Sequence, residues 1–222
     1  MNYRIKASDV AAIIGKNPYK SREDILFQYI HGKSKDDIAF ESALIEQPVE
    51  TQELIKNTIQ QSKREDIVNT EEKIQALPEK VKEYVKHEIY KNNGTHRERR
   101  VAETHNVKRD TKWYSMKITE DVRLVGLIDG RRGEDSIIEI KNRQKRLFGH
   151  VPLYEYIQCQ VYMKLTGTEK CTLIEQFGDD SNSFDLEFSY TMWELEILPA
   201  LRSFAHEITE EKSTSSSPSS VK

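Results

Sequence analysis

The chain has 222 residues, which is enough for one domain with a buried core. Charged residues make up 32% of it and hydrophobic residues 36%, a balance that favours solvated helices around a modest core over a disordered chain. The formal net charge of -3 does not indicate nucleic-acid binding, yet it does not exclude it, because a carboxylate-rich metal site counts as negative before its ions bind.

Membrane spans and disulfides are not expected. No apolar run approaches the ~18 residues that cross a membrane, and the N-terminal residues lack the apolar centre of a signal peptide. The two cysteines, Cys159 and Cys171, lack the spacing of metal ligands. We therefore expect a reduced, intracellular protein with no membrane partner.

Two short helices with clear end signals are predicted at the N-terminus. The segment ASDVAAIIG is predicted as a helix that Ser8 caps and Gly15 ends. After the turn NPYK, Ser21 and Asp24 form a capping arrangement for a second helix, which Gly32 closes.

A polar helical insertion is predicted over residues 33–92. Isolated aliphatic residues recur there at helical spacing, which predicts two exposed amphipathic helices that begin near Pro48 and Pro78. The pair Asn93-Gly94 then signals a turn before a further helix.

The apolar period changes to two between residues 113 and 141. WYSMKI, VRLVGLID and SIIEIK are predicted as strands, the last two joined by a hairpin turn at RRGED. A helix ending at Gly167, two more strands and a closing helix interrupted near Pro199 follow. The pattern predicts a mixed α+β fold, with a small central mixed sheet flanked by helices, in a single domain over 1–210 and a disordered tail over 211–222.

Three charged side chains in these strands suggest a site. Glu139 and Lys141 share one face of their strand, and Asp129 comes near Glu139 if the two strands pair. Two neighbouring carboxylates repel unless a cation lies between them, and the carbonyl of Ile140 would add an oxygen ligand of the kind that Mg²⁺ or Mn²⁺ prefers. Lys141 would orient water or stabilise charge at a phosphate. A surface hairpin with alternating charges explains the same residues equally well.

Asp129 followed by Glu139-Ile140-Lys141 resembles the PD-(D/E)XK nuclease signature. Four blocks, in order over most of residues 7–167, resemble the lambda-exonuclease and YqaJ-like viral recombinase branch of that superfamily: ASDVAAIIGKNPYKS, NNGTHRERRVAETHNV, GLIDGRRGEDSIIEIK and YIQCQVYMKLTG. The resemblance implies a restriction-endonuclease-like core. Ile128 replaces the proline of the signature.

The resemblance also implies roles for the site residues. Asp129 and Glu139 would bind two Mg²⁺ ions together with Glu98, and Mn²⁺ would substitute. Lys141 would assist the attacking water, and Gln158 would support Lys141 or the scissile phosphate. Without the resemblance, Glu98 is an ordinary helix glutamate.

A second set of residues is expected to contact DNA. Ser8 matches a position that the family uses near the 5′-phosphate, although it could equally be only a helix cap. Lys16 and Lys20 would contact backbone phosphates, and Arg4 would stand in for a basic residue that the phage enzymes carry further upstream. Tyr162 and Arg143 complete the predicted set. Tyr162 could also be a core aromatic residue. Arg143 belongs to the basic cluster KNRQKR, and that cluster could also be a solvated face.

The function implied is that of a metal-dependent 5′-3′ exonuclease acting on double-stranded DNA in viral or phage recombination or replication. The implied partners are double-stranded DNA, a single-strand annealing protein and further copies of the chain, since phage relatives are trimers. Three alternatives stay open: an endonuclease or RNA-cutting nuclease on the same core, a non-catalytic nucleic-acid-binding module, and a scaffold built on the helices of 33–92.

Overall fold

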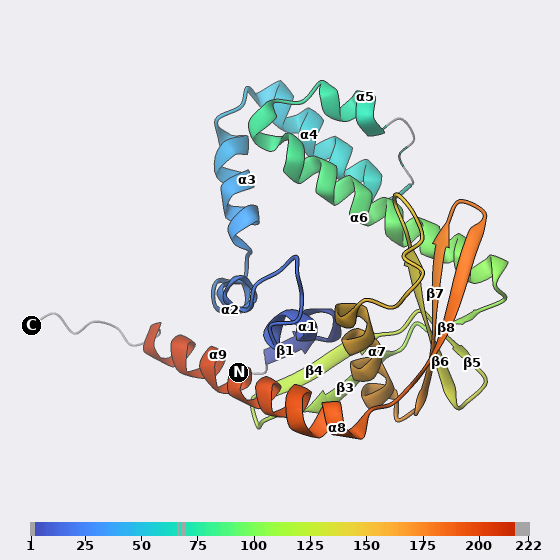
Figure 1. The fold of residues 1–222 in the computed structure, drawn as a ribbon. Coiled ribbons are helices and arrows are strands. Elements are labelled where there is room, and N and C mark those ends of the chain that lie inside the picture. The colour runs from blue at the N-terminus through green and yellow to red at the C-terminus, as the bar shows by residue number, and fades with distance from the viewer. Residues whose placement is uncertain (1–2, 66, 68–69, 216–222) are drawn as a thin grey trace, which may run out of the picture. The chain divides into compact units, whose positions relative to one another are not determined.

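The computed structural model describes residues 3–65, 67 and 70–215, and its chain folds into two compact units (Figure 1). The first unit combines Met1–Gly32 with Asn106–Lys222, and the second is Lys33–His105. The predicted insertion therefore lies inside the second unit, which extends past it to His105. The predicted single domain over residues 1–210 stays a prediction.

The first unit contains two mixed sheets. In one, β4 (Val122–Leu127) lies between β1 (Tyr3–Lys6), to which it is parallel, and β3 (Trp113–Lys117), to which it is antiparallel. The other has the strand order β2-β5-β6-β7-β8, with the bounds Lys108–Arg109, Gly130–Arg132, Ser136–Asn142, Lys170–Phe177 and Asp180–Glu187. Only β6 and β7 are parallel neighbours in this second sheet.

The predicted mixed α+β architecture, with mixed strands flanked by helices, is confirmed, and the structure divides the strands between two sheets. The strand VRLVGLID does not pair with SIIEIK, because β1 and β3 occupy both of its edges. The short β5 pairs with β6 instead, and the chain passes from one sheet to the other at Ile128 and Asp129. The sequence did not reveal β1, since Ile5 is its one fully buried residue.

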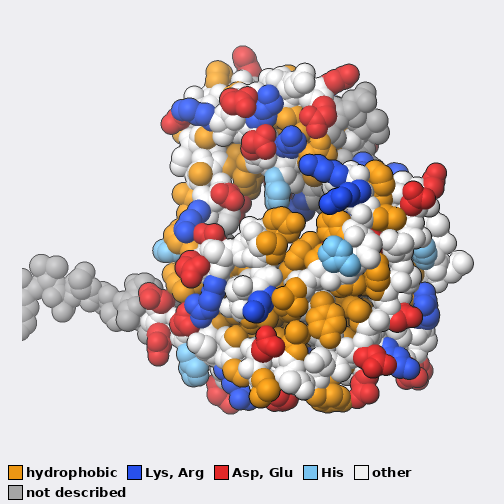
Figure 2. Space-filling view, in the orientation of Figure 1, with side chains coloured by type: hydrophobic (Ala, Val, Ile, Leu, Met, Phe, Trp, Pro, Cys, Tyr) orange, Lys and Arg blue, Asp and Glu red, His pale blue; other side chains and the backbone are white. Residues whose placement is uncertain are grey.

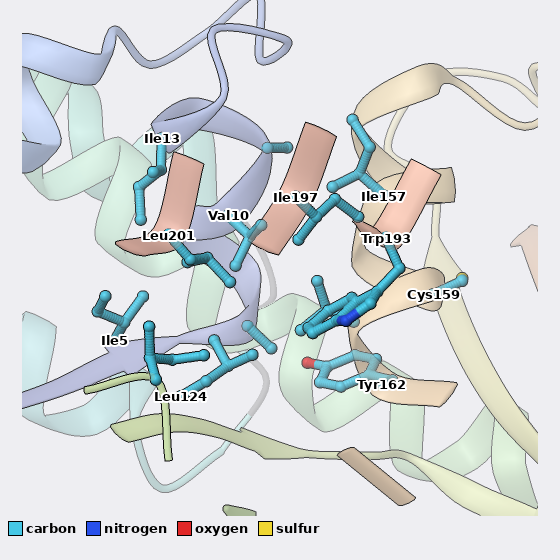
Figure 3. Close-up of a cluster of buried hydrophobic side chains, with 14 of the residues drawn as sticks. Ile5, Val10, Ile13, Leu124, Ile157, Cys159, Tyr162, Trp193, Ile197 and Leu201 are labelled. Carbon is cyan, nitrogen blue, oxygen red and sulfur yellow. The ribbon is translucent and has the colours of Figure 1, made fainter. Parts of the chain in front are cut away.

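Helices cover the sheets of the first unit. Their bounds, after a 3₁₀ turn at Ala7–Asp9, are α1 (Val10–Ile13), α2 (Arg22–His31), α7 (Leu153–Thr166), α8 (Tyr190–Met192) and α9 (Leu198–Ser215). Figure 3 shows side chains from β1, β4, α1, α7 and the closing helix pointing toward one another. Trp193, Phe204 and Leu124 are among the fully buried side chains of this core.

The predicted helix ends are mostly confirmed. Ser21 Oγ accepts from the amide of Asp24 at 3.0 Å, and Gly32 ends α2 with a φ of 76°. The cap predicted at Ser8 is wrong, because the chain enters a 3₁₀ turn directly from β1 and Ser8 lies exposed inside that turn.

The closing helix is interrupted as predicted. A π-helical turn over Trp193–Ile197 directly precedes α9, whose second residue is Pro199. Proline has no N–H and its ring disturbs the preceding turn, which accounts for the irregular hydrogen bonding there. Helix α9 reaches Ser215, beyond the predicted start of the tail, and the rest of that prediction, 216–222, lies outside the described residues.

The described part of the second unit is helical. It contains α3 (Lys35–Ile45), α4 (Val49–Ser62), α5 (Thr70–Gln75) and α6 (Glu79–Thr104) around a separate core of aliphatic residues. The turn predicted at Asn93-Gly94 is wrong, because α6 runs through it. The Asn93 side chain is buried and bonds both to the amide and to the carbonyl of Ile67, at 3.0 and 3.2 Å, so the tertiary contact holds this residue in the helix.

None of the helices, over the residues described, has the length and apolar content needed to cross a membrane.

Candidate active site

The site is built where the two sheets of the first unit meet under α7. Glu139 and Lys141 occupy alternate positions of β6 and so share the face that α7 covers. Gln158 and Tyr162 project toward them from α7, one helical turn apart. Asp129 follows the end of β4 and directly precedes β5.

Asp129 and Glu139 are brought together by the pairing of β5 with β6. Gly130 pairs with Ile138, so Asp129 lies opposite Glu139. The amide of Ile140 donates to Asp129 Oδ2 at 2.7 Å. Burial raises the pKa of Asp129, while the Ile140 amide and the charge of Lys141 oppose that rise. A cation at this position would therefore stabilise the ionised pair.

Lys141 is held between an acid and an amide. Its Nζ lies 2.7 Å from Glu139 Oε1 and donates to Gln158 Oε1 at 3.0 Å. Burial alone would lower the pKa of Lys141, but the adjacent Glu139 carboxylate raises it by more, so the net shift is upward. The side chain therefore stays an ammonium ion at neutral pH.

Gln158 connects Lys141 to Tyr162. Its Nε2 donates to the Tyr162 hydroxyl at 3.0 Å. The tyrosine is 7% exposed, and Figure 3 shows its ring among the core side chains, so it supports the glutamine from the core side. Its position depends on Gly126 in β4, where an added Cβ would come within 2.8 Å of the Tyr162 ring.

The candidate site has a net charge of one negative unit. The carboxylates of Asp129 and Glu139 contribute two negative charges, and the ammonium of Lys141 contributes one positive charge. Carboxylate oxygens are donors that suit Mg²⁺ and Mn²⁺, and the main chain of Ile140 lies beside both acids. Among the residues described, no group of three or more His, Cys, Asp or Glu side chains is gathered closely enough to hold a metal ion. Two acids with one backbone carbonyl make a partial ligand set of the expected chemistry.

Glu98, the third predicted acidic ligand, lies half-buried on α6 in the second unit. The group formed within the first unit therefore contains two of the three predicted acids.

The predicted DNA contacts near the N-terminus are at the surface. Arg4, Ser8, Lys16 and Lys20 are all exposed. Lys20 Nζ lies 4.0 Å from the buried carboxylate of Asp9, which also accepts from the Tyr29 hydroxyl at 3.0 Å.

Arg143, the predicted phosphate contact after β6, has its guanidinium inside the protein. The side chain is 8% exposed and is bonded to Glu155 and Glu175. This geometry does not support a direct phosphate contact by Arg143.

Sequence reasoning missed these two glutamates. Their signal was present: Glu155 lies three residues before Gln158, on the same face of α7, and Glu175 interrupts the apolar strand β7. A glutamate inside an apolar run indicates a buried partner of opposite charge.

Comparison with known proteins identifies the fold. No family model matches the chain, and no curated protein matches it significantly. Among solved structures, an alkaline exonuclease from Laribacter hongkongensis matches with a TM-score of 0.54 and 15% identity, over 96% of this chain and 93% of that chain. The same exonuclease in complex with dAMP matches with a TM-score of 0.56 and 16% identity, over 95% and 90% of the two chains. The chain therefore shares the fold of this alkaline exonuclease.

Proposed function

We propose that this protein is a divalent-metal-dependent nuclease that hydrolyses double-stranded DNA from its 5′ ends. The observation that carries the proposal is the arrangement of Lys141, an ammonium ion held between Glu139 and Gln158 beside the half-buried Asp129. A fold shared with alkaline exonucleases supports it, and the dAMP in one of those structures is a deoxynucleotide, the class of product expected here.

Each residue has a chemical task in this proposal. Asp129, Glu139 and the carbonyl of Ile140 would hold Mg²⁺, and Glu98 would complete a site for two ions, in which Mn²⁺ can substitute. The ions would supply Lewis acidity toward the phosphate. The Lys141 ammonium would donate to the attacking water or to the phosphate oxygens as negative charge develops.

Gln158 and Tyr162 would position the ammonium rather than react. A free lysine side chain has many rotamers. Its hydrogen bonds to Glu139 and to the Gln158 amide would hold the Lys141 side chain in one of them. Because Tyr162 bonds the other end of the Gln158 amide, the direction in which that amide faces is also set. Geometry fixed in advance lowers the cost of orienting groups during the reaction.

The proposal extends to a biological role and to partners. Digestion of one strand would leave a 3′ single strand for an annealing protein, as the family resemblance implies for viral or phage recombination. The same resemblance implies a homo-oligomer. Light scattering of the purified protein, alone and with a candidate annealing protein, tests both.

The direct test is a time course on duplex DNA labelled at the 5′ or the 3′ end, with and without a 5′-phosphate, in Mg²⁺ and in EDTA. We expect mononucleotides to appear from the 5′ end in Mg²⁺ only. Sealed circular DNA and RNA are the controls for mode and substrate. Cleavage of sealed circles would show that the protein is an endonuclease. Binding of DNA without any cleavage would show that it is a non-catalytic binding module.

A further inference from the structure

The loop between β6 and α7, residues 143–152, is fixed to the protein interior. Figure 1 shows it leaving the end of β6 and reaching the start of α7. The amides of Phe148 and Gly149 donate to the carboxylate of Glu175, at 3.0 and 2.9 Å. The amide of Arg143 donates to the carbonyl of Gln176 at 2.7 Å.

The Arg143 side chain connects the same loop to α7. Its Nε donates to Glu175 at 2.9 Å, and its two terminal nitrogens donate to Glu155 at 2.6 and 2.8 Å. Glu175 is 0% exposed and also accepts from Asn182 at 2.9 Å. Three of the residues that donate to this fully buried carboxylate lie in the loop and the fourth lies in β8, so Glu175 ties the loop to the sheet.

The fixed loop presents basic side chains to solvent. Lys145 and Arg146 are exposed, and no acidic residue occurs between 142 and 152. Over the part of the chain that the structure describes, neither of these two side chains forms an ion pair. Figure 2 shows basic and acidic side chains interspersed over the face in view.

The two basic residues are close to the candidate site along the chain. Lys145 is four residues beyond Lys141, and four extended residues span at most about 14 Å. Each nucleotide of a duplex strand advances about 3.4 Å along the axis. Phosphates within about four nucleotides of the reacting bond are therefore in reach of the loop.

We propose that the β6–α7 loop binds the phosphate backbone of the nucleic-acid substrate through Lys145 and Arg146, and that Glu175 is the positioning residue that holds the loop in its binding conformation. The proposal rests on the nuclease function above and adds a phosphate subsite within about four nucleotides of the bond that is cut.

Binding measurements without cleavage test the subsite. The double variant Lys145→Ala/Arg146→Ala is compared with Lys170→Ala/Arg202→Ala, which removes two exposed positive charges from the far end of β7 and from α9. The affinity for a short duplex is measured against salt concentration in EDTA. Each phosphate contact contributes about 0.9 to the slope of log affinity against log salt, so the loop variant should lose about 2 and the control nothing.

Neutral backbone linkages locate the contact. Methylphosphonates at the first to fourth positions from the cut should weaken binding by the wild type and leave the loop variant unaffected. An unchanged salt slope in the loop variant, or equal sensitivity of both proteins to these linkages, would overturn the subsite. Cleavage by the wild type is scored separately, so an active enzyme with an unchanged slope refutes the subsite alone, and an inactive wild type refutes the nuclease function.

Glu175→Gln tests the positioning role, since it keeps the shape of the side chain and removes its charge. We expect a reduced salt slope and a raised KM with a smaller change in kcat. A variant that loses thermal stability but keeps the full slope would overturn the positioning role. If the variant does not fold, Asn182→Ala, which removes one donor to Glu175, is measured in the same way, with the same two outcomes.

Discussion

Replacement of Arg143 by methionine should reveal how strongly the buried ion group holds the protein together. Methionine keeps most of the volume of the aliphatic stem but removes the guanidinium. Glu155 and Glu175, whose side chains are 4% and 0% exposed, would then be left without their cation. Removal of one partner from a buried ion pair costs about 3–5 kcal/mol, because the remaining charge has neither water nor a counter-ion.

The structure sets the magnitude within that range. Three guanidinium hydrogen bonds are lost, and the guanidinium also lies 4.0 Å from the ring centre of Phe148. Glu175 keeps its bonds from the Phe148 and Gly149 amides and from Asn182, so it is partly compensated. We therefore expect a loss near the lower end, about 3 kcal/mol.

Urea unfolding of the two proteins at several pH values measures the effect. In the variant, two buried carboxylates remain without the cation that offsets their charge. This cost is largest at neutral pH, where carboxylates are ionised, and smallest in acid, where they are protonated, so the difference between the two proteins should shrink as the pH falls. A loss below about 1 kcal/mol, or a loss that does not change with pH, would refute the reasoning.

Three further perturbations have defined outcomes. Lys141→Met should retain DNA binding in a filter assay and lose most Mg²⁺-dependent turnover, and full turnover would contradict the role of the ammonium. Gly130→Ala should destabilise the protein by about 1–3 kcal/mol in thermal unfolding, since the added methyl would lie 2.7 Å from the carbonyl oxygen of Lys108; an unchanged melting temperature would contradict this packing. Burial raises the pKa of Glu175, but hydrogen bonds from Asn182, two loop amides and Arg143 outweigh burial and lower the pKa from 4.5 to about 2. The ionised Glu175 therefore stabilises the folded protein by an amount on the order of 3 kcal/mol. This contribution should be complete above pH 4.5 and be lost as the pH falls toward 2. Glu175→Gln should weaken this acid dependence in denaturant titrations, and an identical pH profile would argue against it.

Local physical chemistry made much of this fold predictable from the sequence. Side-chain caps and glycine ends are short-range features, and so the helix from Arg22 to His31 was found with its cap at Ser21. Alternation of apolar residues likewise located the strands β4 and β6. Alternation also placed Glu139 and Lys141 on one face of their strand, and the family resemblance added Gln158 to the candidate site.

Pairing and burial depended on residues far apart in the chain. The sequence could not show that β1 would take the edge of β4, or that Asn93 would bond to Ile67 and keep a turn signal helical, because both outcomes are decided by long-range contacts. The Arg143, Glu155 and Glu175 group arises for the same reason, since the β6–α7 loop, α7 and β7 each contribute one of its charges. Local preferences act over a few residues and are written in the order of the amino acids, whereas a buried charge finds its partner only when distant segments fold together.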